Sequence, residues 1–292
     1  MNTNNFDFSS IDLGGENSLP HESFTARDGK KLYYRSLLSP EKSSPILILI
    51  HGSAGNSEYF QNMAAKISQE AIAHVYTPDM RGHGYFPERR GDIDYIGQLE
   101  DDLHDFIVHI KKELPTAKII LGGHSSGAGF ALKYAAGKYN KDVERLLLLA
   151  PYLGHDTPMV RKDFGYASPH LARFIFLKII NRLGITSFNS WKVLTFNIPE
   201  QFLNPSITTE YSFRMTETFQ TDDYQKDFAK LNKLTLLLVG SKDEASITQN
   251  FEPVIKQITR NVIVQIVNDH NHINLVTEAN INSFLQEWLH TK

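Results

Sequence analysis

The chain has 292 residues, of which 41% are hydrophobic, a formal net charge of −3 and no cysteine. This length suits one large domain, or a domain with an insertion. Acidic and basic residues are mixed along the chain, so the sequence lacks the basic stripe that is typical of nucleic-acid-binding proteins. We therefore expect no nucleic-acid partner. The missing cysteines exclude disulfides, thiolate metal sites and a cysteine nucleophile, and they are compatible with a reducing, cytoplasmic location.

The first 20 residues are predicted to form a flexible or loosely docked arm. Residues 1–19 are polar and rich in Asn and Ser, and they have neither the basic nor the apolar region of a secretory signal. We also expect no integral membrane span. The most apolar long stretch, residues 171–183, is too short and is interrupted by Arg173, Lys178 and Arg182.

Strand and helix patterns alternate along the first half of the chain. Apolar runs such as residues 46–50 are typical of strands buried on both faces, and the three-four spacing within residues 96–114 is typical of a helix. In chain order we predict a hairpin at 22–38, a strand at 46–50, a helix at 58–69, a strand at 73–77, a helix at 96–114, a strand at 117–121, a helix at 128–139 and a strand at 143–150.

The alternation lapses at residue 151 and returns near residue 231. Strands are predicted at 234–239 and 262–267, with a helix near 248–256 between them and a last helix at the C-terminal end. This pattern predicts an α/β fold with a mostly parallel sheet covered by helices on both faces. The expected core therefore comprises residues 21–150 and 231–292, and residues 151–230 form an insertion.

The insertion contains 14 of the chain's 32 aromatic residues and shows no clear buried strand. One interpretation is a small helical subdomain that needs these rings for its own core. The other is an apolar cap over an active site, which would select acyl or aromatic substrates. The two interpretations are compatible.

A G-x-S-x-G pentapeptide, residues 123–127, lies between the strand at 117–121 and the helix at 128–139. This context predicts a nucleophile elbow, in which Ser125 adopts a strained backbone conformation above the sheet edge. The small residues are required because larger side chains would collide in so tight a turn. At a helix N-terminus the hydroxyl also lies where a developing anion is favoured.

A serine nucleophile needs a base, and the base needs a carboxylate to orient it. Asp243 follows the strand at 234–239, and we expect it to be that carboxylate, with Glu244 pointing elsewhere. Asp156, after the strand at 143–150, is the alternative acid. After the last strand, His272 is the preferred base because the apolar residues that follow it can dock the last helix, and His270 is the alternative.

Two further features of these loops bear on the chemistry. A His-x-His pair such as 270 and 272 could bind a metal, but no other ligand cluster in the sequence supports one.

A reacting carbonyl oxygen also needs two fixed donors. We expect them to be the backbone N–H groups of Ser126, directly after the nucleophile, and of Ser53, in the glycine-rich loop after the strand at 46–50.

In this order the motifs resemble the α/β-hydrolase superfamily: His51 to Gly55, Asp79 to Gly84, Gly123 to Gly127, Gly240 to Asp243, and His272. The Asp-x-Arg-Gly-His-Gly segment is similar to the monoacylglycerol-lipase and lysophospholipase-like, serine aminopeptidase-type branch. The resemblance covers residues 24–292 and implies an eight-stranded sheet with a helical cap. Ser126 departs from many relatives, which have methionine there, and the insertion matches no branch.

These residues predict a serine hydrolase for carboxylic esters, with Ser125 as nucleophile, His272 as base and Asp243 as orienting acid. The expected partner is a small apolar ester, with lipid monoesters as the first guess, and no metal or organic cofactor is needed. The same triad would serve a thioesterase, a proline-type aminopeptidase or a carbon–carbon bond hydrolase. A binding protein with slow turnover is a further alternative, and the sequence does not fix the oligomeric state.

Overall fold

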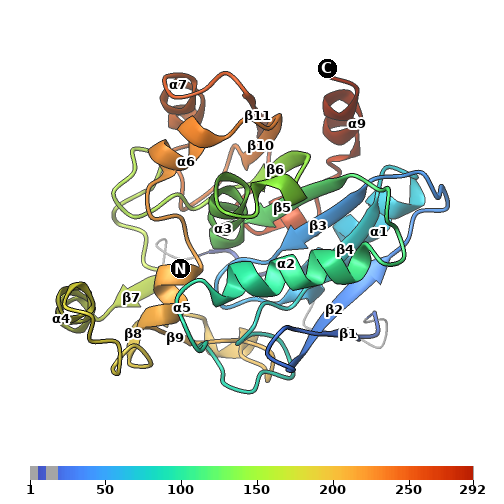
Figure 1. Cartoon of the computed structure of the whole chain (residues 1–292). Coiled ribbons are helices and arrows are strands. Elements are labelled where there is room, and N and C mark those ends of the chain that lie inside the picture. Colours follow the sequence, from blue (N-terminus) through green and yellow to red (C-terminus); the bar gives the residue numbers. More distant parts are fainter. Residues whose placement is uncertain (1–5, 11–18, 292) are drawn as a thin grey trace.

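The apolar runs of the sequence form the centre of an eight-stranded sheet (Figure 1). The computed structural model describes residues 6–10 and 19–291. The strands lie in the order β1-β2-β4-β3-β5-β6-β10-β11. The pairs β1–β2 and β2–β4 are antiparallel, and the other neighbouring pairs are parallel. The mostly parallel sheet expected from the sequence is therefore confirmed.

The strand bounds lie within a few residues of the predicted ones. The strands of the sheet are β1 (Glu22–Thr25), β2 (Lys31–Leu37), β3 (Ile46–Ile50), β4 (His74–Pro78), β5 (Ile119–His124), β6 (Arg145–Leu149), β10 (Thr235–Gly240) and β11 (Val262–Val267). Every residue of β3, β4, β5 and β10 is buried, as a sheet covered on both faces requires.

Helices cover both faces of the sheet (Figure 1). One face packs against α2 (Gln98–Ile110), α3 (Ser126–Ala136), α6 (Tyr224–Lys230) and α7 (Phe251–Lys256). The other packs against α1 (Gln61–Gln69), preceded by a 3-10 turn, and against α8 (Asn274–Thr277) and α9 (Asn282–His290). None of the helices in the described part of the chain is long and apolar enough to cross a membrane.

Helix α2 is shorter than its sequence pattern indicates. Gly97 has a φ of 98°, a left-handed conformation that precedes the first helical turn. Ile96, which the pattern places on the buried face, is therefore outside the helix and 45% exposed. The helix ends at Ile110, and turns lead from there to Pro115.

Residues 151–230 contain strands that the sequence pattern does not reveal. The elements of this segment include β7 (Ala167–Pro169), α4 (Leu171–Arg182), β8 (Lys192–Phe196), β9 (Glu210–Ser212) and α5 (Phe213–Thr218). The three strands form an antiparallel sheet of their own beside the helices. They span only three to five residues each, which is too short for a hydrophobic period to be recognised.

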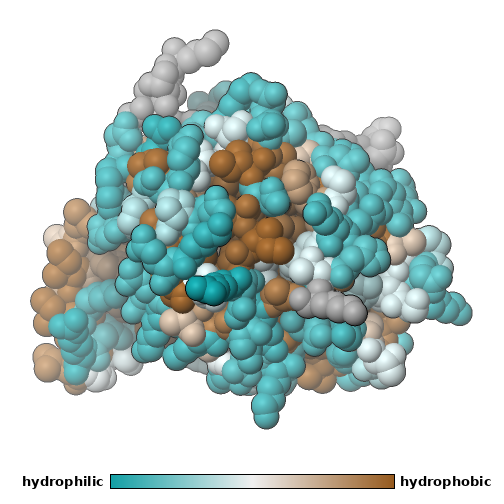
Figure 2. Space-filling model, turned by 90° about the horizontal axis from the view of Figure 1, so that it is seen from above, coloured by the Kyte–Doolittle hydropathy of each residue, from teal (hydrophilic) through white to brown (hydrophobic). Residues whose placement is uncertain are grey.

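The aromatic residues of the insertion have several environments. Phe174 and Phe213 pack in a small local core with residues of α4 and β8. The outer face of α4 is apolar and exposed, at Leu171, Ile175 and Ile179. Seen from above, hydrophobic residues gather at the left edge of the molecule, the side on which Figure 1 places α4 (Figure 2).

Candidate active site

Ser125 occupies a tight turn between β5 and α3. Its backbone has φ 54° and ψ −122°, a conformation that non-glycine residues rarely adopt. A Cβ on Gly123 would lie 2.3 Å from the carbonyl oxygen of Gly127, and a Cβ on Gly127 would lie 2.2 Å from that of His51. Since both approaches are far inside van der Waals contact, the elbow requires glycine at both positions.

Asp243 and His272 meet beyond the carboxyl ends of β10 and β11. Asp243 Oδ2 and His272 Nδ1 are 2.8 Å apart, and both side chains are buried. Because an ionised carboxylate can only accept a hydrogen bond, Nδ1 carries the proton and donates to Asp243, and Nε2 is left as the acceptor. Nε2 is buried and has no hydrogen-bond partner among the described residues.

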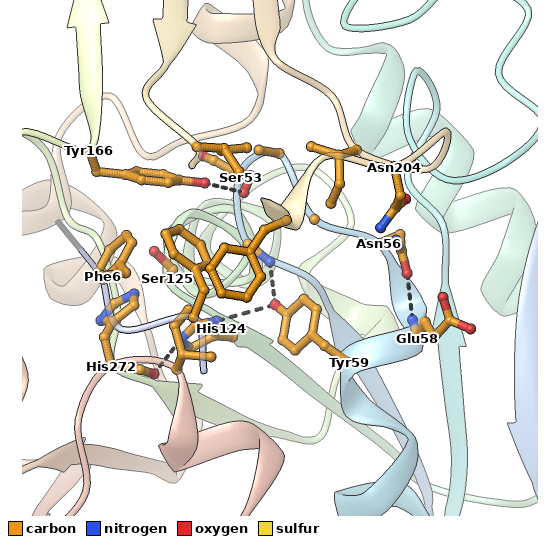
Figure 3. Close-up of a pocket in the computed structure, with 18 residues that line it drawn as sticks. Phe6, Ser53, Asn56, Glu58, Tyr59, His124, Ser125, Tyr166, Asn204 and His272 are labelled. Carbon is orange, nitrogen blue, oxygen red and sulfur yellow. Dashed lines mark hydrogen bonds between the residues drawn. The ribbon is translucent and has the colours of Figure 1, made fainter. Parts of the chain in front are cut away.

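Ser125 and His272 line the same cavity, although no hydrogen bond joins the Ser125 hydroxyl to Nε2 in the described residues (Figure 3). Such hydrogen bonds are often long before substrate binds. The three residues that the sequence singled out therefore lie around one site, from three separate loops.

The two sequence alternatives lie elsewhere. The side chain of Asp156 is 99% exposed and forms an ion pair with Lys162. The partly exposed ring of His270 contacts the carbonyl oxygen of Asn268 through Nδ1. Neither residue lines the cavity. Among the residues that the structure describes, no three His, Cys, Asp or Glu side chains gather in a way that could hold a metal ion.

Glu244 has a role that the sequence did not suggest. We expected it to point away from the site, but its Oε2 accepts the backbone N–H of His272 at 3.0 Å. Its Oε1 accepts the backbone N–H of Asp7 at 3.0 Å. Because one carboxylate binds both backbones, Glu244 fixes the histidine loop and attaches residues 6–10 to it.

His124 and Tyr59 connect the elbow with the two neighbouring loops. His124 Nε2 donates to the carbonyl oxygen of His272 at 3.0 Å, and Nδ1 accepts from the Tyr59 hydroxyl at 3.1 Å. The Tyr59 oxygen in turn accepts the N–H of Gly52 at 2.6 Å. Burial, and then the neighbouring charge of His272, hold the pKa of His124 well below its usual value, so the linking imidazole is neutral.

The backbone N–H groups of Ser53 and Ser126 make no hydrogen bond to other residues of the described chain. Their side chains do interact, since Ser53 Oγ donates to Ser126 Oγ at 2.7 Å. Ser126 is buried and does not line the cavity, so its hydroxyl ties the two loops together instead of shaping the cavity wall.

The cavity around Ser125 has a volume of about 80 Å³. Its wall is mostly apolar, and five of its residues come from the insertion: Tyr166, Ile198, Phe202, Asn204 and Ile207. Figure 3 shows Phe6 and Tyr166 on the side of His272, whereas Asn56, Glu58 and Asn204 lie at the opposite end. The cavity therefore has an apolar end and a polar end, and the serine lies on the side of Phe6 and His272.

Comparison with known proteins agrees with this geometry. Residues 41–273 match the family model described as Serine aminopeptidase, S33. The chain belongs to this α/β-hydrolase family. The superfamily expected from the sequence is therefore confirmed.

Individual relatives are distant. An uncharacterized protein of Mycobacterium tuberculosis is 29% identical over 117 residues, which cover 40% of this chain and only 32% of that protein. Lipase 3 of Moraxella sp. is 25% identical over 89% of this chain and 81% of its own length. A thermophilic esterase from Thermogutta terrifontis has a TM-score of 0.63 at 19% identity, over 92% of this chain and 98% of the esterase, which shows a shared fold.

Replacing Tyr59 with Phe tests the link between the loops. The change leaves the buried Gly52 N–H without its acceptor and His124 Nδ1 without its donor, which costs about 1–3 kcal/mol of stability. We expect kcat for hydrolysis of p-nitrophenyl esters to fall about tenfold or more, because the loop that carries Ser53 loses its fixed position. Tyr33→Phe is the control, since the Tyr33 hydroxyl lies outside this network. Equal rates for both variants would contradict the role assigned to Tyr59.

Buried neutral histidines make the stability of the fold depend on pH. Burial lowers the pKa of His51, His83 and His124 below the usual 6.5. Below about pH 6.5 these histidines therefore bind protons in the unfolded chain but remain neutral in the folded one. The free energy of unfolding consequently falls as pH drops below about 6.5. The limiting slope is about 1.4 kcal/mol per pH unit for each histidine.

Urea unfolding between pH 7.5 and 5.5 measures this slope. We expect His124→Gln to flatten it, and His170→Gln, at an exposed position, to leave it unchanged. A slope of opposite sign in the wild-type protein would refute the argument.

Proposed function

We propose that this hydrolase cleaves carboxylic esters of apolar acyl groups through an acyl-serine intermediate. The observation that carries the proposal is that the strained Ser125 opens into a mostly apolar cavity, which His272, bound to Asp243, also lines. In this proposal Ser125 is the nucleophile, His272 the general base and Asp243 the acid that orients it.

The reaction would proceed in two steps. His272 Nε2 takes the hydroxyl proton as Ser125 Oγ attacks the ester carbonyl, and the backbone N–H groups of Ser53 and Ser126 stabilise the oxyanion. The C–O bond of the ester breaks, and the leaving alcohol takes the proton from Nε2. A water molecule then attacks the acyl-serine, gives its proton to Nε2, and releases the acid.

The two ends of the cavity support a substrate with an apolar acyl group and a polar alcohol. Apolar side chains suit a hydrocarbon chain. Asn56 is bound through its amide to Ser206 and to the Glu58 N–H, and Asn204 Oδ1 accepts from Ser206. The amide NH₂ group of Asn204 suits a hydroxyl of an alcohol such as glycerol. A glycerol monoester or another small ester with an apolar acyl group has this distribution, and the residues of the insertion that line the cavity would act as its cap.

Glu58 is the residue that bears on the aminopeptidase alternative, because recognition of a free amine needs a carboxylate. Arg35 lies 3.7 Å from Glu58 Oε1, and the Tyr85 hydroxyl donates to Oε2 at 3.3 Å. A carboxylate already compensated by a buried arginine attracts an ammonium group less strongly. This favours an uncharged ester over an aminoacyl substrate.

A panel of p-nitrophenyl esters, monoacylglycerols, acyl thioesters and aminoacyl anilides tests the proposal, together with fluorophosphonate labelling and peptide mapping. We expect many turnovers on esters and a label on Ser125. Ser125→Ala and His272→Ala should each lower kcat by several orders of magnitude, and Asp243→Asn by about 10⁴-fold.

His270→Ala is the matched control for His272→Ala and should cost far less. Equal losses for the two histidines would contradict the choice of base. Product that never exceeds one equivalent on any substrate would favour a binding protein. A preference for thioesters or aminoacyl anilides would replace the ester assignment.

A further inference from the structure

Two phenylalanines from the N-terminal end of the chain line the cavity beside the candidate catalytic residues. The Phe6 ring stacks on the His272 imidazole, with centroids 4.3 Å apart and planes 16° from parallel (Figure 3). It also contacts Phe164 and Tyr166, each at 4.6 Å. The Phe8 ring is 7% exposed and lies 5.3 Å from Phe202 of the insertion. Both rings therefore belong to the cavity wall.

Residues 6–10 are attached to the rest of the chain at two points, through Glu244 beside the histidine loop and at α8. The backbone N–H of Asp7 donates to Glu244, whose other oxygen accepts the N–H of His272. The hydroxyl of Thr277, in α8, donates to Ser10 Oγ at 2.9 Å. The sequence predicted a flexible or loosely docked arm for residues 1–20. Residues 1–5 and 11–18 lie outside the described part, but residues 6–10 pack against the site.

The volume of the cavity indicates what these rings do. At about 80 Å³, the cavity is well below the roughly 300–1,000 Å³ typical of sites for drug-sized ligands. The side chains of Phe6 and Phe8 form part of the wall, and each fills space that a smaller side chain would leave to the cavity. Ser125 lines the same cavity as the two rings.

We propose that Phe6 and Phe8 are specificity-determining residues that limit the acyl chain to a short length. The proposal rests on the proposed esterase function and adds a size limit to it. A short acyl group fits beside the two rings with its carbonyl at Ser125, whereas a longer chain meets the rings before the carbonyl reaches the serine. The limit is set by residues 6–10 together with the insertion.

Chain-length profiles test this limit. Phe6→Ala, Phe8→Ala and the double variant are compared with wild type on p-nitrophenyl acetate, butanoate, hexanoate, octanoate and decanoate. Each methylene that gains a buried site is worth about fourfold in binding. We therefore expect the ratio of kcat/KM for decanoate to that for acetate to rise at least tenfold in the double variant, with smaller increases in the single variants.

Phe86→Ala is the matched control, because Phe86 is an exposed phenylalanine outside this cavity. It should keep the wild-type ratio. The milder variants Phe6→Leu and Phe8→Leu, checked by circular dichroism and thermal unfolding, cover the case in which an alanine variant fails to fold. They should shift the profile in the same direction by a smaller factor.

Two results would overturn the proposal. An equal loss of rate at every chain length would mean that the rings only hold His272 in place. An equal gain in kcat/KM at every chain length would mean that residues 6–10 block the entrance to all substrates and do not select by the length of the acyl chain.

A binding experiment separates this proposal from the esterase assignment. Calorimetry measures butanoate and decanoate binding to Ser125→Ala, with and without the two phenylalanine substitutions. Tighter decanoate binding in the substituted protein supports the size limit even if no ester is turned over, in which case the proposed function alone fails. Ester turnover with an unchanged chain-length profile and unchanged decanoate binding overturns the size limit alone.

Discussion

The backbone conformation of Ser125 is the constraint on which the other features of the site depend. A left-handed φ at a serine costs about 1–3 kcal/mol unless neighbouring contacts compensate for it. Here the Ser125 N–H donates to Leu149 in β6, and its carbonyl oxygen accepts N–H groups from Ala128, Gly129 and Tyr152. The elbow is therefore held from the sheet, from its own helix and from the start of the insertion.

The same turn sets the distance between the elbow and the loop after β3. Because Gly127 has no side chain, α3 approaches the carbonyl oxygens of Ile50 and His51 directly. The backbone N–H of Ser126 is thereby brought next to the Ser53 loop, and the contact between the two serine hydroxyls links them. Tight packing of backbone against backbone thus brings the loop that carries Ser53 next to the elbow, before any side chain contributes.

The histidine loop is restrained at several atoms at once. The carbonyl oxygen of His272 accepts from His124, and its N–H donates to Glu244. The Nδ1 atom of His272 binds Asp243, and one face of its ring stacks on Phe6. These contacts leave Nε2 as the atom of the ring that can accept a proton. The sheet brings the three loops to one edge, and these hydrogen bonds then fix the orientation of the imidazole within that edge.

Local patterns allowed the sequence to predict most of the sheet, the elbow and the positions of Asp243 and His272. Each of these depends on a short motif, or on a residue that directly follows a strand. The contacts of Glu244, Tyr59 and Phe6 join residues that are far apart in the chain and belong to no motif, so no periodicity could reveal them. The short strands of the insertion were missed because three to five residues do not establish a period.

Aromatic content was a poor guide to the cavity for a related reason. Of the 14 aromatic residues in the insertion, only Tyr166 and Phe202 line it, and others fill the cores of the insertion and of the main sheet. The polar N-terminal segment contributes just as many rings, Phe6 and Phe8. Composition measures how much apolar surface a segment must bury, but it does not say against which partner. Part of the wall beside Ser125 therefore comes from a segment that lies outside both the sheet and the elbow.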